Sequence, residues 1–210
     1  GAGMGHLTRL FSYARRLDGH AATHVLSMSQ AAPVAGRLGH SFEYLPSAKT
    51  LDMPTGRWRP MFVDRVSEAI ARHRADVVVF DGTWPYNGID EIRRRAPRPT
   101  WVWSRRGMWR KGLNADQLAK THWFDEVLEP GDFAAAYDRG ATVATRPHRV
   151  APVTLLDPAD TEDRASARRH LGLPPDGRLA LVSLGAGNIN DTAHDLGAAV
   201  AALDALGVGV

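Results

Sequence analysis

The stretch Asp76-Val77-Val78-Val79-Phe80-Asp81 decides the fold, because it is the clearest strand in the sequence. An unbroken run of apolar residues, without polar alternation, is typical of a parallel strand that is covered on both faces. Apolar residues at helical spacing predict an amphipathic helix before it, over residues 61–73, and a short helix after it, over residues 89–95. We therefore expect this strand to lie in a parallel sheet with helices packed against it.

The same alternation of strands and helices extends in both directions along the chain. Leu7, Leu10, Phe11, Ala14 and Leu17 recur at the spacing of a helix. Further strands are expected at residues 23–28, 41–45, 100–104 and 124–128, and a short helix at residues 132–138. Repeated βα units predict an α/β protein with a Rossmann-like, doubly wound parallel sheet.

The pattern changes after about residue 153. A linker at residues 156–160 precedes a predicted helix at 161–171, a break rich in Gly and Pro at 172–177, and a new buried strand at 179–184. A glycine loop and a helix over residues 192–206 follow. We expect an N-terminal domain at residues 1–154, a linker and helix at 155–177, and the start of a second Rossmann-like domain at 178–210.

Both ends of the sequence predict that it belongs to a longer protein. A glycine loop that opens a helix normally follows a buried strand, which would lie before Gly1. The second domain holds only one strand, one loop, one helix and the start of a strand. We expect roughly another 100–200 residues to follow, and we expect residues 1–210 alone to lack activity.

Composition narrows the class of protein. Of 210 residues, 44% are hydrophobic, which indicates a globular chain rather than a disordered one. The absence of Cys excludes disulfides, thiolate metal sites and cysteine nucleophiles. No run of roughly 18 apolar residues and no N-terminal leader is visible, so we expect a cytoplasmic protein. The net charge of +3 is too small to predict a nucleic-acid partner.

Two polar residues are expected at one edge of the sheet. Gly1-Ala2-Gly3-Met4-Gly5-His6 places His6 at the start of a helix, where backbone N–H groups favour an anion. Asp81 ends the decisive strand, and ligands of parallel sheets bind beyond the carboxyl ends of the strands. A carboxylate close to His6 would orient the imidazole as a general base. The alternatives are that His6 is a polar helix cap and that Asp81 caps the next turn.

A second feature of that edge is the segment at residues 104–111, in which four cations are interleaved with Trp103 and Trp109. It suits a phosphate or lipid headgroup, and the same pattern occurs in proteins that bind single-stranded nucleic acid. The alternative is a solvated loop with one buried Trp.

The glycine loop Gly185-Ala186-Gly187-Asn188 follows the predicted strand of the second domain. Its N–H groups could hold a diphosphate, or it could be a plain βα turn. The Gly-Lys-Ser/Thr of a P-loop is missing, and His6 stands where a dinucleotide fingerprint needs Gly. No group of His and acidic residues is spaced for a metal, so we expect neither a metal nor a bound cofactor.

Three segments resemble the GT-B glycosyltransferases, in particular the UDP-sugar-dependent glucosyl- and glucuronosyltransferases and the bacterial transferase that completes lipid II. Residues 3–9 resemble the glycine–histidine loop after the first strand of that family. Residues 77–82 resemble the strand whose terminal Asp assists the catalytic His. Residues 170–174 and 181–185 resemble the entry into the second domain, although the loop at Gly185 lacks the Ser-Gln form of the lipid II enzyme.

The resemblance implies two Rossmann-like domains, the first binding an acceptor and the second a nucleotide-sugar. His6 would be the base that deprotonates the acceptor hydroxyl, Asp81 would orient it, and the reaction would invert the anomeric centre without a required metal. We expect the acceptor to contact Gly3, Gly5, Trp84, Arg105 and Arg106. We expect the nucleotide-sugar donor to contact Gly185, Gly187 and Asn188.

The expected partners are a nucleotide-sugar and a small-molecule or lipid-linked acceptor, with peripheral contact to the inner face of a membrane and no nucleic acid. Two alternatives remain open: a non-catalytic α/β module that binds a sugar nucleotide or a partner, and a sugar-nucleotide epimerase.

Overall fold

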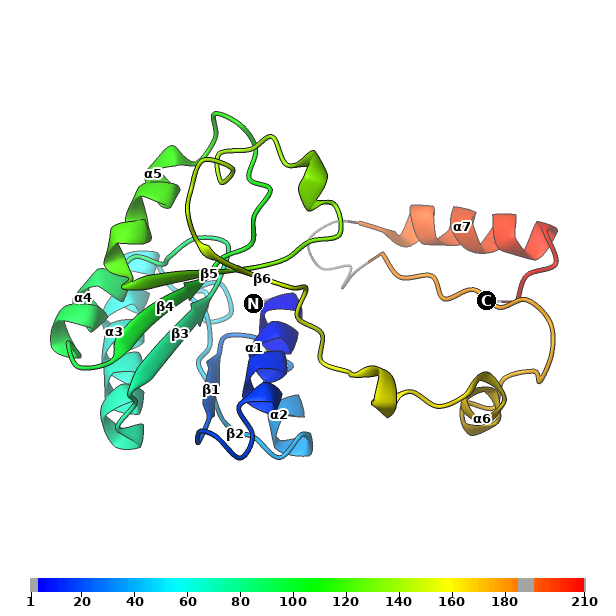
Figure 1. Cartoon of the computed structure of the whole chain (residues 1–210), viewed down its shortest axis with the longest axis horizontal. Helices are drawn as coiled ribbons and strands as arrows, with labels where there is room; N and C mark the ends of the chain where they lie inside the picture. Colours follow the sequence, from blue (N-terminus) through cyan, green and yellow to red (C-terminus); the bar gives the residue numbers. More distant parts are fainter. Residues whose placement is uncertain (1–3, 185–190, 210) are drawn as a thin grey trace. The chain divides into compact units, whose positions relative to one another are not determined.

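The computed structural model describes residues 4–184 and 191–209. The chain divides into two compact units, of which the first ends at Leu155 and the second begins at Leu156. The elements of the first unit are α1 (Gly5–Arg16), β1 (His24–Ser27), α2 (Val34–Arg37), β2 (Ser41–Tyr44), α3 (Thr55–His73), β3 (Val77–Asp81), α4 (Ile89–Arg95), β4 (Thr100–Ser104), α5 (Ala115–Ala119), η1 (Lys120–Trp123), β5 (Glu126–Pro130), η2 (Ala135–Tyr137) and β6 (His148–Val150). Those of the second are η3 (Pro158–Asp160), α6 (Arg164–His170) and α7 (Ala193–Ala205) (Figure 1).

A four-stranded parallel sheet, ordered β3-β4-β5-β6, forms the centre of the first unit. Val77 pairs with Thr100 and Asp81 with Ser104, so β3 and β4 end at the same level. A second parallel sheet consists of β1 and β2. The predicted α/β class with Rossmann-like parallel strands is therefore confirmed.

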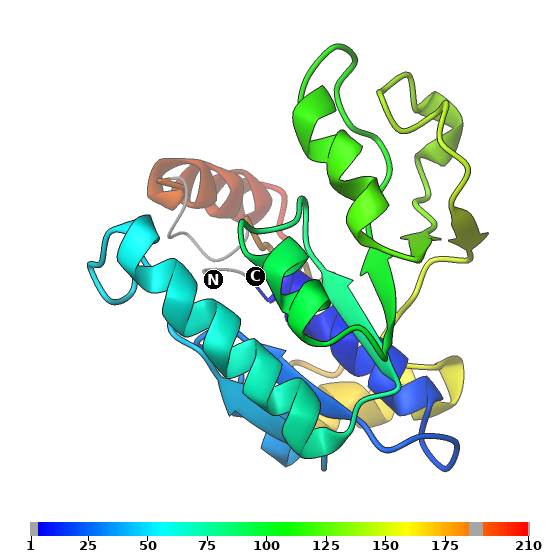
Figure 2. The same ribbon diagram turned by 90° about the vertical axis from the view of Figure 1, so that its left-hand side faces the viewer.

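Helices α3 and α4 pack side by side against one face of the four-stranded sheet, as Figure 2 shows (cyan to green). Their apolar side chains meet those of β4, and the fully buried members of this core include Val63, Ile92, Trp101 and Trp103. The alternation of side chains along a strand brings both Trp rings to the same face, because they are two residues apart.

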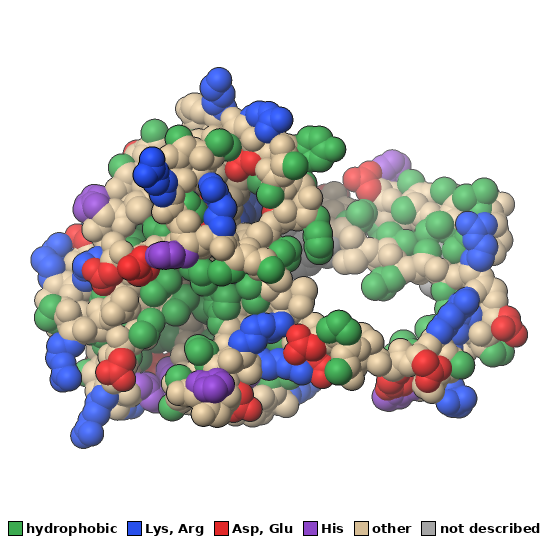
Figure 3. Space-filling model, viewed as in Figure 1, with side chains coloured by type: hydrophobic (Ala, Val, Ile, Leu, Met, Phe, Trp, Pro, Cys, Tyr) green, Lys and Arg blue, Asp and Glu red, His purple; other side chains and the backbone are tan. Residues whose placement is uncertain are grey.

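The opposite face of β3 differs from the expectation that both faces are covered. Val78 and Phe80 pack into the core, but Val77 is 54% exposed and Val79 is also exposed. Helix α1 bonds to β3 through His6 and Arg9, whose side chains meet Asp81 at the carboxyl end of the strand. Figure 3 shows hydrophobic side chains gathered on the molecular surface over this sheet.

Helix α1 is held by a smaller core of its own. Leu7 and Phe11 lie one turn apart on α1 and are buried together with Val25 of β1 and Ala35 of α2. This packing fixes the face of α1 that turns inward, and so places the remaining side chains of its first turns.

Element boundaries differ from the prediction mainly near Pro. Helix α3 begins at Thr55 rather than at residue 61, with Pro60 inside it. The prediction began at residue 61 because the apolar residues at helical spacing begin with Met61. Strand β5 ends at Pro130, two residues later than predicted, and only a 3₁₀ turn forms within residues 132–138. The short elements α2 and β6 were not predicted.

The second unit contains the predicted helices but not the predicted strand. The Asp163 side chain accepts hydrogen bonds from Ala165 N and Ser166 N, so α6 begins at Arg164. Leu179 forms one parallel bridge to Gly209, and the residues described between 180 and 184 form no strand; Leu181 is 95% exposed. A strand needs neighbouring strands to bond its backbone, and one bridge supplies too little.

No helix within the described residues is long and apolar enough to cross a membrane.

Candidate functional site

His6 and Asp81 meet at the carboxyl end of β3. His6 is the second residue of α1 and Asp81 the last residue of β3. The Nδ1 atom of His6 lies 2.6 Å from Oδ1 of Asp81. The Asp81 side chain is fully shielded from solvent, whereas that of His6 is 49% exposed. The two residues therefore form a pair with a buried carboxylate and an accessible ring.

Asp81 accepts further hydrogen bonds from two residues. Arg9 donates from Nε to Oδ2 at 2.7 Å and from Nη2 to Oδ1 at 3.3 Å. Ser104, its register partner on β4, donates from Oγ to Oδ2 at 2.5 Å. The Ser104 hydroxyl also lies 2.9 Å from the hydroxyl of Tyr13. Because Ser104 Oγ gives its proton to the carboxylate, Tyr13 is the donor in this second bond.

The donors around Asp81 keep it ionised. Burial by itself raises the pKa of the carboxyl, but hydrogen bonds from His6, Arg9 and Ser104, together with the charge of Arg9, bring its pKa below the ordinary value. An ionised carboxylate only accepts hydrogen bonds, so His6 Nδ1 carries a proton in this pair. A neutral ring with its proton on Nδ1 has an unprotonated Nε2, and Nε2 of His6 has no partner among the described residues.

Two tyrosines near the pair also have shifted pKa values. Burial raises the pKa of Tyr13, and the negative charge of Asp81 adds to this increase, while the hydrogen bond to Ser104 opposes it. Burial and Asp81 raise the pKa of Tyr86 in the loop after β3. Both phenols are therefore neutral, and Tyr13 is a reliable donor at neutral pH.

Arg105 and Arg106, predicted together as acceptor contacts, have different surroundings. Arg105 is 1% exposed; its Nη2 donates to Glu129 Oε2 at 3.2 Å and Thr145 Oγ1 at 2.7 Å. Its guanidinium lies over the ring of Trp103, and burial lowers its pKa. Arg106 is exposed, and its side chain has no partner within the described residues. Arg105 thus supports the loop after β4, and Arg106 is the residue available to a ligand.

The remaining predicted contacts are less constrained. Gly5 begins α1 and has open space around its α-carbon. Trp84, in the loop after Asp81, is 43% exposed. Gly3, Gly185, Gly187 and Asn188 lie outside the described residues. The interaction of Gly5 and Trp84 with an acceptor stays a prediction.

A small cavity of about 220 Å³ adjoins the His6–Asp81 pair through Arg9. Arg9 lines it together with the loop after β4, including Arg106, and the turn after β5, including Asp132. All three segments lie at the carboxyl edge of the sheet.

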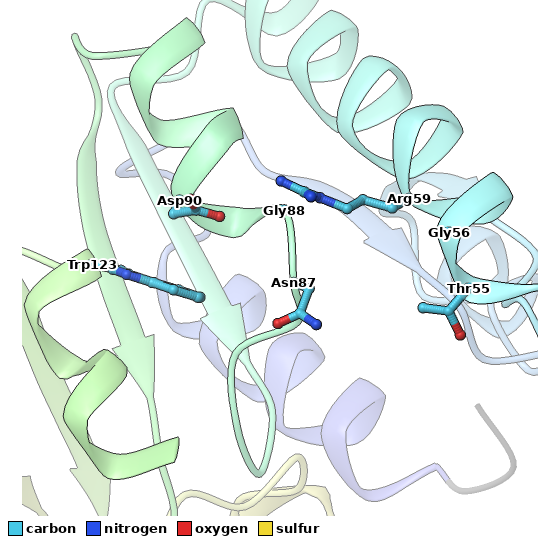
Figure 4. A pocket seen from close by; sticks show the side chains of 7 residues that line it. All are labelled: Thr55, Gly56, Arg59, Asn87, Gly88, Asp90 and Trp123. Carbon is cyan, nitrogen blue, oxygen red and sulfur yellow. The ribbon is translucent and has the colours of Figure 1, made fainter. Parts of the chain in front are cut away.

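A larger cavity of about 450 Å³ lies between the first turn of α3 and the loop that precedes α4. Its lining includes Arg59, Asn87, Asp90 and Trp123, and Figure 4 shows these side chains around the open space. Arg59 pairs with Glu91, and Asp90 pairs with Arg94, so its charged groups are already neutralised. Neither His6 nor Asp81 lines this cavity.

Three members of the site were missed in the sequence. Arg9 and Tyr13 lie three and seven residues after His6, which is the spacing of one helix face and was a usable signal. Ser104 ends the strand next to β3, but only the register shows that it stands opposite Asp81.

Chemically, the pair can take a proton from a hydroxyl that approaches Nε2 of His6. Among residues 4–184 and 191–209, no three His or acidic side chains cluster in a way that could hold a metal ion.

The chain was compared with protein-family models, with curated proteins and with solved structures, and none of the three comparisons finds a match.

Proposed function

We propose that these residues belong to an inverting glycosyltransferase in which His6 is the general base and Asp81 orients it. The observation that supports the proposal is the hydrogen bond between His6 Nδ1 and Asp81 Oδ1 at 2.6 Å, with Nε2 left open at the carboxyl edge of a parallel sheet. This edge is where ligands of such sheets bind. The resemblance of residues 3–9 and 77–82 to the GT-B family suggests which reaction the pair serves.

In the proposed reaction, the acceptor hydroxyl oxygen forms a bond to the anomeric carbon of the donor sugar. Its proton passes to Nε2 of His6, and the bond from the anomeric carbon to the nucleoside diphosphate breaks, with the electron pair leaving on the diphosphate. Asp81 holds Nδ1–H and stabilises the positive charge that develops on the ring. The donor contacts proposed at Gly185, Gly187 and Asn188 lie outside the described residues.

Arg9 has two opposing effects on this mechanism. Its two bonds to Asp81 fix the carboxylate, which favours a constant position for His6. Its positive charge also neutralises part of the negative charge that would stabilise a protonated ring. Arg9 therefore strengthens the positioning of His6 by Asp81 and weakens the electrostatic stabilisation of the protonated ring.

The test uses the natural polypeptide that contains residues 1–210, supplied with UDP- and TDP-sugars and a panel of hydroxyl acceptors. Release of nucleoside diphosphate and formation of the glycoside are measured. His6→Ala is expected to lower turnover about a hundredfold or more, the usual scale for losing a general base. His20→Ala is the matched control, because His20 is exposed and lies outside the site, and it should keep full turnover.

Each alternative function has its own outcome in this assay. Conversion of the sugar nucleotide to its epimer without acceptor would identify an epimerase. Binding of the sugar nucleotide without turnover would identify a non-catalytic module. Full turnover in His6→Ala would show that the base is another residue.

A further inference from the structure

We propose that the 220 Å³ cavity beside Arg9 binds a carboxylate carried by the acceptor, so that the natural acceptor is an acidic molecule. The inference rests on the proposed function, because it assigns the cavity to the acceptor of that reaction. Complete sites for small molecules usually occupy ~300–1,000 Å³. This cavity is smaller and therefore suits one end of a ligand whose hydroxyl is directed toward His6.

The cavity is built from three segments that the sheet brings together. Arg9 comes from the second turn of α1, Arg106 and Gly107 from the loop after β4, and Gly131 and Asp132 from the turn after β5. None of these segments is adjacent in sequence to another. Their meeting at the carboxyl edge places the cavity where a parallel sheet presents its ligands.

Arg9 connects the cavity to the catalytic pair. Its Nε and Nη2 bind Asp81, whereas Nη1 has no partner in the described part of the chain. A guanidinium can bind one carboxylate on one side and donate to a second on the other, because its five N–H groups lie in one plane and point in different directions. An acceptor carboxylate on Nη1 would therefore be held next to the residue that positions Asp81.

Arg106 supplies the second cation, and its loop is rigidly supported. The preceding residue, Arg105, is buried and donates hydrogen bonds to Glu129 and Thr145. The next residue, Gly107, lies close to Glu129, since a Cβ there would lie 3.1 Å from Glu129 Oε1. Met108 has a positive φ of 61° and donates its N–H to Asp138 at 3.0 Å. A supported loop loses less entropy when it binds a ligand.

The cations that line the cavity can bind one carboxylate. Arg9 is positive but already pairs with Asp81, and Arg106 is the exposed cation beside it, while Asp132 is the acidic residue of the lining. Oδ1 of Asp132 accepts a hydrogen bond from the backbone N–H of Ala134 at 2.8 Å, within the turn after β5. A phosphate dianion would be repelled by Asp132 more strongly than a carboxylate, and carboxylates fit the planar fork of Arg.

The experiment measures binding by titration calorimetry, without donor, using 4-hydroxybenzoate as the acidic probe and 4-hydroxybenzyl alcohol as its neutral twin. The natural polypeptide is expected to bind the acid at least tenfold more tightly than the alcohol, since a charged hydrogen-bonded pair contributes roughly this much. Arg106→Gln should weaken binding of the acid about tenfold, and Asp132→Asn should strengthen it, by removing the like charge. Arg110→Gln, an exposed position in the same loop, is the control and should change nothing.

Opposite effects of Arg106→Gln and Asp132→Asn would support the proposal, because a loss of folding would weaken binding in both. Equal affinity for acid and alcohol, or effects of the same sign in the two variants, would overturn it. Tighter binding of 4-hydroxyphenyl phosphate than of 4-hydroxybenzoate would overturn the choice of carboxylate. Since no turnover is involved, these results stay separate from those of His6→Ala.

Discussion

Nδ1 of His6 lies 2.6 Å from Oδ1 of Asp81, which joins two residues 75 positions apart in one hydrogen-bonded pair. Arg9 and Ser104 both donate hydrogen bonds to Oδ2 of the same carboxylate. Asp81 thus receives donors from both α1 and β4, and it ties the N-terminal helix to the central sheet. The same contact bears on stability and on the proposed chemistry.

Asp81→Asn is expected to lower turnover about a hundredfold, because the amide nitrogen can donate to Nδ1 and leave the proton on Nε2, the wrong tautomer for a base. Turnover of the double variant His6→Ala/Asp81→Asn should equal that of His6→Ala, since the two residues act as one unit. Multiplicative losses in the double variant would mean that Asp81 acts independently of His6.

Stability should depend on pH through Asp81 in the acid range. Its folded pKa is below the ordinary value, so the unfolded chain takes up the proton at higher pH than the folded chain. The stabilisation is fully present above the ordinary range of about pH 4 and is lost as pH falls through the folded pKa. Urea unfolding between pH 7 and pH 2 should show a decline that is smaller in Asp81→Asn; an identical decline would contradict the assignment.

The chain of bonds from Tyr13 through Ser104 to Asp81 predicts unequal effects of two small substitutions. Tyr13→Phe removes one hydrogen bond and should cost about 1 kcal/mol. Ser104→Ala removes the hydrogen bond to Asp81 and also leaves the partly buried Tyr13 hydroxyl without an acceptor. It should lower the free energy of unfolding by about 2 kcal/mol. Ultraviolet titration should show two tyrosines, Tyr13 and Tyr86, that ionise above the usual range, and only Tyr86 should do so in Tyr13→Phe.

The neighbouring residues Arg105 and Arg106 should respond differently to the same change. Arg105→Gln removes a cation that pairs with buried Glu129, and we expect a loss of about 3 kcal/mol in the free energy of unfolding. Arg106→Gln changes an exposed side chain and should stay within about 0.5 kcal/mol. Denaturant unfolding of both variants makes the comparison, and equal losses would show that the two side chains do not differ as described.

Alanine substitutions at two glycines should have opposite effects on stability. Gly88 has a φ of 111°, and a Cβ there would lie 2.9 Å from Val63 Cγ2 in the core. Gly88→Ala should therefore destabilise by about 1–3 kcal/mol. Gly56→Ala, in the first turn of α3 with open space around it, should stabilise by up to about 1 kcal/mol. Thermal unfolding should move the melting temperature down in the first variant and up in the second.

The sequence by itself determined the class of fold and predicted that His6 and Asp81 lie at the same edge of the sheet. The apolar run before Asp81 indicated a parallel strand that ends at the carboxyl edge of the sheet. The glycine loop that carries His6 was expected at the same edge, so the two residues were predicted to lie close together. Their contact at 2.6 Å agrees with that expectation. Local patterns suffice here because helix and strand periods are local properties of the chain.

Only the tertiary structure decided which neighbouring residues complete the site. Ser104 reaches Asp81 through the register of β3 and β4, and Arg105 turns inward while Arg106 turns outward because Glu129 and Thr145 accept the first guanidinium. The exposure of Val77, in a strand that the sequence predicted to be covered on both faces, is likewise visible only in the folded structure. These features depend on contacts between residues far apart in sequence. No local pattern encodes the register of two strands, the packing of their side chains or the partner that a buried charged group requires.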